Sequence, residues 1–367
     1  MSNDIKVKKD NQEYLIDKTS KEKKVMKKEN VNELKPLPQN YTKRGFFSKD
    51  FWNDRNVGLL TELKTGKEEY KDLDVRLRGN EIHVYYNGGK ILGIKKNAIE
   101  FDDKYLRHKE SHPNINIENI KNKWFYVNNN GNLKIKPVSN LTDFPSFIND
   151  LKSVMDAWFK ENPHDERMHQ QFISLKEHDN LYIIDIEFAV SFNSKCYNKE
   201  YKDTKKRLKE KENYKPFERY PNPRFDLIGI DNSGQIHVFE LKTGLNSTKN
   251  MTEHIEDFVN MIGSADTNFQ VIRFEEFNNE MALILDTYNS NNTLKNKIPV
   301  KIDIKKRPIF HFIFTEKGDE SNFDEFSKLV KDIYKKLDII PEYHQLIEKH
   351  ILDTEAIKVS KDFKIKI

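Results

Sequence analysis

The pattern of apolar and polar residues changes twice along the chain and divides it into three parts. Residues 1–40 mix Lys, Glu, Asp and Asn with few large apolar side chains, so we expect a flexible charged tail there. Residues 41–139 contain short alternating segments separated by turns rich in Asn and Gly, which is typical of a β-rich accessory domain. In residues 140–367 apolar positions first recur at helical spacing and then form continuous runs, which predicts a second domain.

The same pattern predicts the individual elements of both domains. In the accessory domain we expect one helix that ends before Gly66, followed by strands at 74–78, 81–86, 90–94 and 124–127. In the second domain we expect helices at 141–159, 166–175, 252–262 and 274–288, strands at 181–190, 224–231, 235–242 and 308–314, and further helices near the C-terminus. This order predicts an α+β or α/β fold in which a mixed sheet is flanked by helices.

The amino-acid composition excludes several classes of protein. The chain of 367 residues has 63 Lys and Arg against 59 Asp and Glu, a net charge of +4 that is far from the basicity of a protein that coats nucleic acid. The single cysteine, Cys196, excludes an intrachain disulfide framework and cysteine-rich metal sites, and favours a reducing compartment. No apolar run approaches membrane-spanning length, and no secretory signal is visible. We therefore expect a cytoplasmic protein that does not span a membrane.

The candidate chemistry lies in two apolar segments joined by Asn232-Ser233-Gly234. Such a turn predicts an antiparallel hairpin, which would place Asp226 and Glu240 on neighbouring strands. Since side chains alternate along a strand, Glu240 and Lys242 share one face while Leu241 points to the other. Asp226, Glu240 and Lys242 can therefore converge.

Two carboxylates held together in a partly dry sheet repel each other, and this repulsion favours a bound cation. Mg²⁺ suits such a pair because it prefers oxygen ligands and is usually held by one or two carboxylates together with phosphate oxygens. An adjacent lysine can orient a water and stabilise the negative charge that develops when a phosphodiester is attacked. The sequence Glu-Leu-Lys-Thr-Gly also occurs at Glu62, at the end of a predicted helix, and we interpret that copy as helix surface.

Residues 141–318 resemble the PD-(D/E)XK, or restriction-endonuclease-like, nuclease superfamily. Pro223-Arg224-Phe225-Asp226 stands where the motif aspartate belongs, and Glu240-Leu241-Lys242 matches the (D/E)XK element. The segment from Asp165 to Gln171 resembles the preceding helix of such enzymes, and His254 to Phe258 is similar to a His-x-x-Asp-Phe helix that follows the motif lysine in some branches. The resemblance implies a restriction-endonuclease-like core and Mg²⁺-dependent phosphodiester hydrolysis, with Mn²⁺ as a substitute metal.

The resemblance also implies roles for individual residues. Asp226 and Glu240 would ligate the metal, the carbonyl of Leu241 would add a ligand, and Lys242 would position the attacking water. Glu166 would complete the acidic pocket; the alternative is an ordinary acid at a helix N-terminus.

Other polar residues leave two interpretations open. Gln170 either touches the substrate or forms a hydrogen bond within the core. Asp185 and Glu187, on one face of the strand at 181–190, are either acids near the metal or residues of an exposed strand face or of pairs with Lys or Arg. We interpret His254 as a polar residue at a helix start rather than as a ligand.

The segment 196–219 places lysines and tyrosines just before the motif aspartate. Lys205, Lys206 and Arg207, together with Arg224 and Gln170, are candidate nucleic-acid contacts, and a solvated charged helix is the competing interpretation for the segment. The sequence thus predicts a metal-dependent nuclease that acts on DNA rather than RNA. A role in defence or restriction is suggested only by the common roles of the superfamily that the chain resembles. The alternatives are a non-catalytic nucleic-acid-binding or regulatory subunit, and a subunit that needs a protein partner; a homodimer is also compatible.

Overall fold

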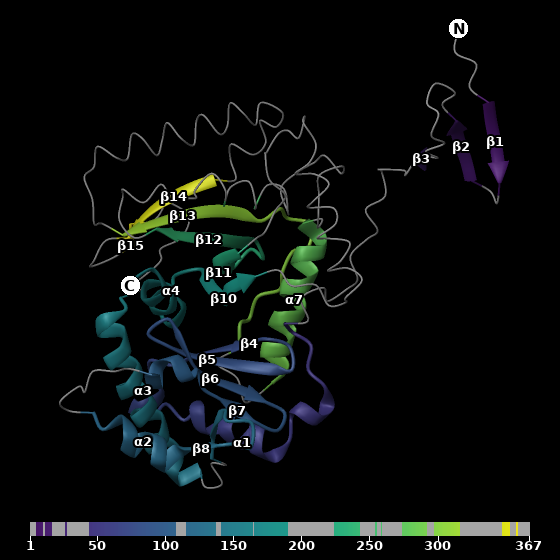
Figure 1. Cartoon of the computed structure of the whole chain (residues 1–367). Coiled ribbons are helices and arrows are strands. Elements are labelled where there is room, and N and C mark those ends of the chain that lie inside the picture. Colours follow the sequence, from purple (N-terminus) through teal and green to yellow (C-terminus); the bar gives the residue numbers. More distant parts are fainter. Residues whose placement is uncertain are drawn as a thin grey trace.

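A computed structural model gives the arrangement of the chain. The structure describes residues 44–107, 115–136, 141–163, 165–189, 224–242, 254, 258, 274–291 and 297–315, and, as strands alone, 5–9, 12–16, 26–27, 347–352 and 357–358. Helices and strands are mixed along the chain, as the sequence predicts (Figure 1).

The N-terminal half contains a four-stranded antiparallel sheet in the order β4–β5–β6–β7. Its strands are β4 (Asp74–Leu77), β5 (Glu81–Tyr86), β6 (Gly89–Lys95) and β7 (Ile99–Glu100). Around it lie α1 (Asp54–Leu63), α2 (Ile117–Trp124), the hairpin of β8 (Phe125–Val127) and β9 (Leu133–Ile135), and the short 3-10 helices Lys49–Phe51, Glu68–Tyr70 and Asp103–Arg107. The predicted helix before Gly66 and the predicted strands are confirmed to within a few residues.

The C-terminal half contains a six-stranded mixed sheet in the order β10–β11–β12–β13–β14–β15. The first three strands form an antiparallel meander, and β12, β13 and β14 run parallel to one another. The bounds are β10 (Leu181–Ala189), β11 (Arg224–Asp231), β12 (Ile236–Lys242), β13 (Ile309–Thr315), β14 (Ile347–Leu352) and β15 (Ile357–Lys358). The helices of this half are α3 (Phe144–Glu161), preceded by the 3-10 turn Leu141–Asp143, α4 (Asp165–Leu175) and α7 (Phe274–Ser290). This mixed sheet with accompanying helices agrees with the prediction.

Two regions differ from the sequence expectation. Near the C-terminus, where helices were expected, the described part consists of strands β14 and β15, because β14 pairs with the edge of β13 and this tertiary pairing overrides the local pattern. In the segment expected to be a tail, β1 (Ile5–Lys9), β2 (Gln12–Ile16) and β3 (Met26–Lys27) form a small antiparallel sheet. Of the helix expected at 252–262 only positions 254 and 258 are described, and both are helical.

The hairpin of β11 and β12 forms as its sequence predicts. The amide of Gly234 donates to the carbonyl of Asp231 at 3.0 Å, and Gly234 has a φ of +80°, which glycine adopts without strain. Every residue of β12 is buried. On one face of the sheet Leu227, Phe239 and Leu241 pack with Ile173 of α4. The predicted burial of the hairpin is therefore confirmed.

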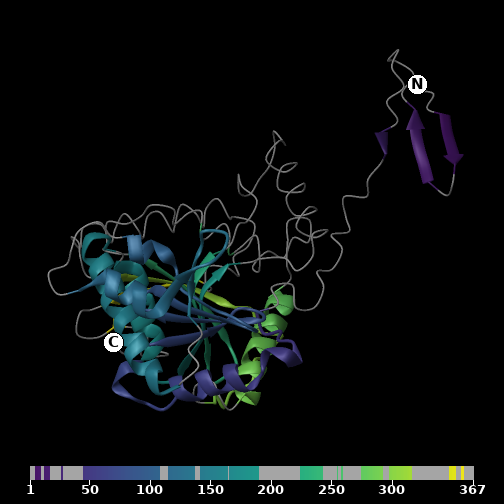
Figure 2. The same ribbon diagram turned by 60° about the horizontal axis from the view of Figure 1, so that its bottom comes forward.

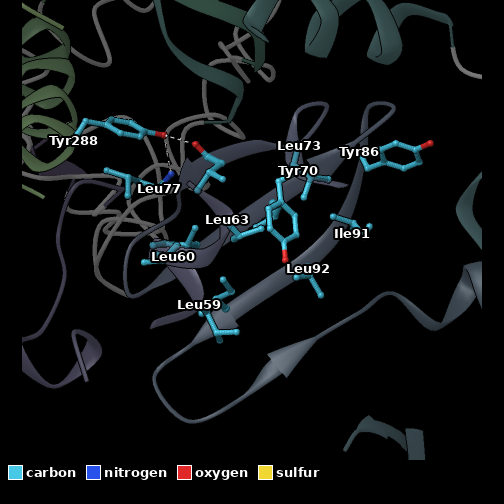
Figure 3. Close-up of a cluster of buried hydrophobic side chains, with 14 of the residues drawn as sticks. Leu59, Leu60, Leu63, Tyr70, Leu73, Leu77, Tyr86, Ile91, Leu92 and Tyr288 are labelled. Atoms are coloured by element: carbon cyan, nitrogen blue, oxygen red, sulfur yellow. Dashed lines mark hydrogen bonds between the residues drawn. The ribbon is translucent and has the colours of Figure 1, made fainter. Parts of the chain in front are cut away.

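The two halves of the chain share one hydrophobic core. A single cluster of buried side chains includes Leu59 and Leu60 of α1, Ile228 of β11 and Met281 of α7. The Tyr288 hydroxyl of α7 donates to the carbonyl of Val75 at 3.0 Å and accepts from the amide of Leu77 at 3.2 Å, so this side chain replaces a strand partner for β4 (Figure 3). Turning the molecule shows α7 beside the strands of both sheets (Figure 2). The predicted boundary near residue 139 is thus crossed by continuous packing.

Three arginines from the N-terminal half form hydrogen bonds with residues of β10. Arg44 donates to Asp185 Oδ2 at 2.6 Å, Arg78 donates to Asp185 Oδ1 at 2.7 Å, and Arg76 donates to the carbonyl of Ile183 at 3.1 Å. Burial would raise the pKa of Asp185, but the charges of Arg78 and Arg44 outweigh burial and hold that pKa below its ordinary value. Asp185 therefore remains ionised inside the protein and joins the two halves.

Replacing Asp185 should destabilise the whole fold. Asp185→Asn leaves the side chains of Arg44 and Arg78, each 9% exposed, without their counter-charge. Removing one partner of a buried ion pair costs about 3–5 kcal/mol, so we expect the free energy of unfolding to fall by about that amount in denaturant titrations. Asp50→Asn, which breaks an exposed pair with Lys96, is the matched control and should leave the titration unchanged. Equal stability of Asp185→Asn and wild type would contradict this account of the network.

Candidate functional site

A cavity of about 590 Å³ lies where α4 meets the ends of strands β10, β11 and β12. Five residues predicted from the sequence line it, and they come from three separate elements: Glu166, Arg224, Asp226, Glu240 and Lys242. The other lining residues are Arg167, Glu187, Ala189, Phe225 and His254. The structure thus brings together five of the seven predicted site residues that lie in its described part.

Strand register explains how the carboxylates meet. Leu227 pairs with Phe239 between β11 and β12, so the next position along each strand sets Asp226 opposite Glu240. Between β10 and β11, Ile186 pairs with Leu227 and Phe188 with Phe225, which sets Glu187 opposite Asp226. Residues opposite each other in an antiparallel pair have Cβ atoms about 5 Å apart. Glu187, Asp226 and Glu240 therefore follow one another across three adjacent strands.

Asp226 is held by two hydrogen bonds. Its Oδ2 accepts from the amide of Leu241 at 2.7 Å, and its backbone carbonyl accepts from the side-chain amide of Gln170. Burial and the nearby charge of Glu240 raise the pKa of Asp226 well above its ordinary value, against the opposing effects of the Leu241 amide and Lys242. Gln170 is only 2% exposed, so the interaction seen is the hydrogen bond within the core rather than a surface for substrate.

Glu240 contacts two basic side chains of the site, Lys242 and His254. Lys242 Nζ lies 2.6 Å from Glu240 Oε1, which confirms that the two side chains share a face of β12. His254 Nε2 lies 3.0 Å from the same oxygen. The prediction of His254 as a polar residue at a helix start therefore missed this contact with the end of β12. The available signal was the sequence His-x-x-Asp-Phe, which begins at His254 after the motif strand.

The two acids of β10 separate, although strict alternation places them together. A φ of +49° at Glu187 breaks the alternation between these two positions. Asp185 is buried between arginines, which was one of the two predicted alternatives, whereas Glu187 lines the cavity. Sequence periodicity could not reveal this difference because it assumes a regular strand.

Glu166 and the basic residues occupy the outer part of the cavity. Glu166 is half-buried, and its charge contributes to raising the pKa of Asp226. Arg224 is exposed at the start of β11. Arg167, which sequence reasoning missed, follows Glu166 in a charged segment that gave no sign of its role. The candidate contacts Lys205, Lys206 and Arg207 lie outside the described residues.

The side chains fit a divalent cation in chemistry. Among the described residues no three His, Cys, Asp or Glu side chains are grouped closely enough to hold an ion by themselves. Mg²⁺ does not need such a cage, because one or two carboxylates with water and phosphate oxygens usually hold it. The neighbouring carboxylates of Asp226 and Glu240 supply this kind of donor set; burial and the charge of Glu240 raise the pKa of Asp226.

Comparison with protein families, with curated proteins and with solved structures finds no match for this chain. Within the described residues, no helix is both long enough and apolar enough to cross a membrane.

The unfavourable ionisation of Asp226 should lower the stability of the folded chain at neutral pH. Because the pKa of Asp226 is higher in the folded chain than the unfolded value of about 3.9, the folded chain binds more protons between these values. The contribution of this group therefore becomes less favourable as pH rises through that window. We expect Asp226→Asn to raise the melting temperature by a few degrees at neutral pH in EDTA, and to flatten its dependence on pH.

Asp231→Asn is a suitable control for this measurement. Burial would raise the pKa of Asp231, but hydrogen bonds from His237 and Ser233 lower it below the ordinary value, so its charge stabilises the fold. Thermal unfolding of Asp231→Asn should show a loss of stability at neutral pH. A melting temperature of Asp226→Asn below that of wild type at neutral pH would count against mutual repulsion in the cavity.

Proposed function

We propose that this chain is a Mg²⁺-dependent nuclease that hydrolyses phosphodiester bonds of DNA, built on a restriction-endonuclease-like core. The observation that carries the proposal is the meeting of Asp226, Glu240 and Lys242 at one cavity, from an antiparallel meander followed by the parallel strand β13. This order of strands and residues is the one that the sequence resemblance implies. A role in defence or restriction, and Mn²⁺ as an alternative metal, are part of the same proposal.

In this proposal Asp226 and Glu240 would hold Mg²⁺. When bound, the ion supplies Lewis-acid stabilisation of phosphate oxygens and a lowered pKa of its bound water. Since the pKa of Asp226 is raised, a proton and the cation compete for its carboxylate. The Leu241 amide, 2.7 Å from Asp226 Oδ2, fixes the direction of that carboxylate. The carbonyl of Leu241 remains a proposed further ligand.

Lys242 and the outer residues serve the substrate. The Lys242 ammonium is 2.6 Å from Glu240 Oε1, and a second N–H on the same nitrogen can donate to a water and orient it toward the phosphorus. Glu166 adds negative charge on the wall formed by α4. Arg224, exposed at the start of β11, offers its guanidinium to the nucleic-acid backbone.

The activity can be tested with a control that the chain itself provides. Purified wild type, Lys242→Ala and Lys64→Ala are incubated with plasmid, linear duplex, single-stranded DNA and RNA in Mg²⁺, Mn²⁺ or EDTA. Lys64 belongs to the second Glu-Leu-Lys-Thr-Gly sequence, and it is exposed at the end of α1. We expect cleavage by wild type and Lys64→Ala, none in EDTA, and a rate at least about 100-fold lower for Lys242→Ala.

Two outcomes would overturn the proposed activity. Equal cleavage by Lys242→Ala and wild type would place the chemistry elsewhere. If folded wild type cleaves none of the substrates with either metal, the result would instead favour a nucleic-acid-binding module or a subunit that needs a protein partner.

A further inference from the structure

Arg167 and Glu187 form an ion pair on the open side of the cavity. Arg167 Nε lies 3.6 Å from Glu187 Oε1, and the two side chains are 54% and 36% exposed. A pair this long and this exposed contributes little to stability, so another anion can replace the carboxylate at small cost. The planar guanidinium of arginine matches the oxygens of a phosphate especially well.

The charge of Arg167 is also less fully matched by an acidic partner than the charge of Lys242, the buried cation of the cavity. Lys242 is 6% exposed in its side chain and lies 2.6 Å from Glu240, so its charge is already matched by a buried carboxylate. The charge of Arg167 is matched only by the long contact with Glu187 among the contacts that the structure describes for it. A phosphate that enters the cavity from solvent therefore meets Arg167 before it meets Lys242.

The backbone of Arg167 is fixed by the turn between β5 and β6. Gly88 has a φ of +74°, and a Cβ atom there would lie 2.5 Å from the carbonyl carbon of Arg167. The Gly88 amide donates to Gln171 Oε1 at 2.6 Å, and Gln171 Nε2 donates to the carbonyls of Asp72 at 2.7 Å and Tyr85 at 3.0 Å. The first turns of α4 are therefore held against the N-terminal half at the position of Arg167.

The backbone of Glu187 is fixed from the same half of the chain. Its carbonyl accepts a hydrogen bond from Arg44 Nη2 at 2.9 Å, and Arg44 is anchored by Asp185. A φ of +49° is costly for glutamate and persists only where the surroundings enforce it. This conformation directs Glu187 to the cavity while Asp185 stays among the arginines.

We propose that Arg167 binds the phosphodiester backbone of the nucleic-acid substrate by exchanging its ion pair with Glu187 for one with a phosphate. This inference rests on the proposed function, because it assigns a substrate contact within the same cavity. Glu187 acts as the counter-ion that keeps Arg167 at the cavity when substrate is absent. Arg44 and Gly88 are positioning residues, so the N-terminal half contributes to the substrate site.

The test is a double-mutant cycle on binding rather than on cleavage. Arg167→Gln, Glu187→Gln and the double variant are titrated with fluorescent duplex DNA in EDTA, over a range of salt concentrations. Loss of one phosphate contact should weaken binding by Arg167→Gln about tenfold at low salt and reduce the slope of log affinity against log salt by about 0.9. Lys160→Gln, which removes an exposed charge from α3 outside the cavity, should leave both quantities close to wild type.

The counter-ion role gives a separate expectation. Glu187→Gln should raise affinity when Arg167 is present and raise it much less in the Arg167→Gln background, because only Arg167 is released. Additive effects of the two substitutions would overturn the exchange, as would an Arg167→Gln titration identical to wild type. A purely structural role of the pair would not produce this dependence on salt and on the partner residue.

The outcomes also separate this inference from the nuclease activity. If wild type cleaves DNA but Arg167→Gln binds as wild type does, the inference fails and the activity stands. If Arg167→Gln weakens binding and no variant cleaves, the phosphate contact stands and the activity fails. Absence of any binding by wild type in EDTA overturns the phosphate contact of Arg167, and the cleavage assay with metal then decides the activity by itself.

Discussion

The buried contact between Asp185 and two arginines is the constraint on which the rest of the structure depends. It requires Arg44 and Arg78, from the N-terminal half, to lie against β10 of the C-terminal sheet. Burying three charges is costly unless they compensate one another, so the two halves must dock in one orientation for any of the charges to be satisfied. Arg44 also donates to the backbone carbonyl of Glu187, so the same docking holds the strand that carries this residue of the cavity wall.

The cavity holds the carboxylate of Asp226 in a fixed position where its ionisation is unfavourable. Strand register sets Asp226 opposite Glu240, and the amide of Leu241 holds the first carboxylate in place. Burial and the proximity of Glu240 raise the pKa of Asp226, so ionising this carboxylate is unfavourable in the folded chain. Such a cost at one position is typical of functional sites, which are seldom optimised for stability alone.

Much of this arrangement could be predicted from the sequence. The turn at Asn232-Ser233-Gly234 and the two-residue spacing of Glu240 and Lys242 were sufficient to place three side chains together, because hairpins and strand alternation are local properties. The convergence of Glu166 on the same cavity required the resemblance as well. Arg44, Arg167 and His254 could not be found in this way, since their roles arise from contacts between distant segments. The separation of Glu187 from Asp185 was missed for a different reason: the left-handed conformation of Glu187 interrupts the alternation on which the prediction rested.

The shared core has a consequence for how the molecule behaves as a unit. Tyr288 completes the hydrogen bonding of β4, and apolar side chains from both halves belong to one cluster. Severing the chain near residue 139 would therefore expose apolar surface on both fragments rather than release two stable domains. The N-terminal half is an obligate part of the folding unit, and any natural or engineered exchange of the C-terminal half would have to include the N-terminal half as well.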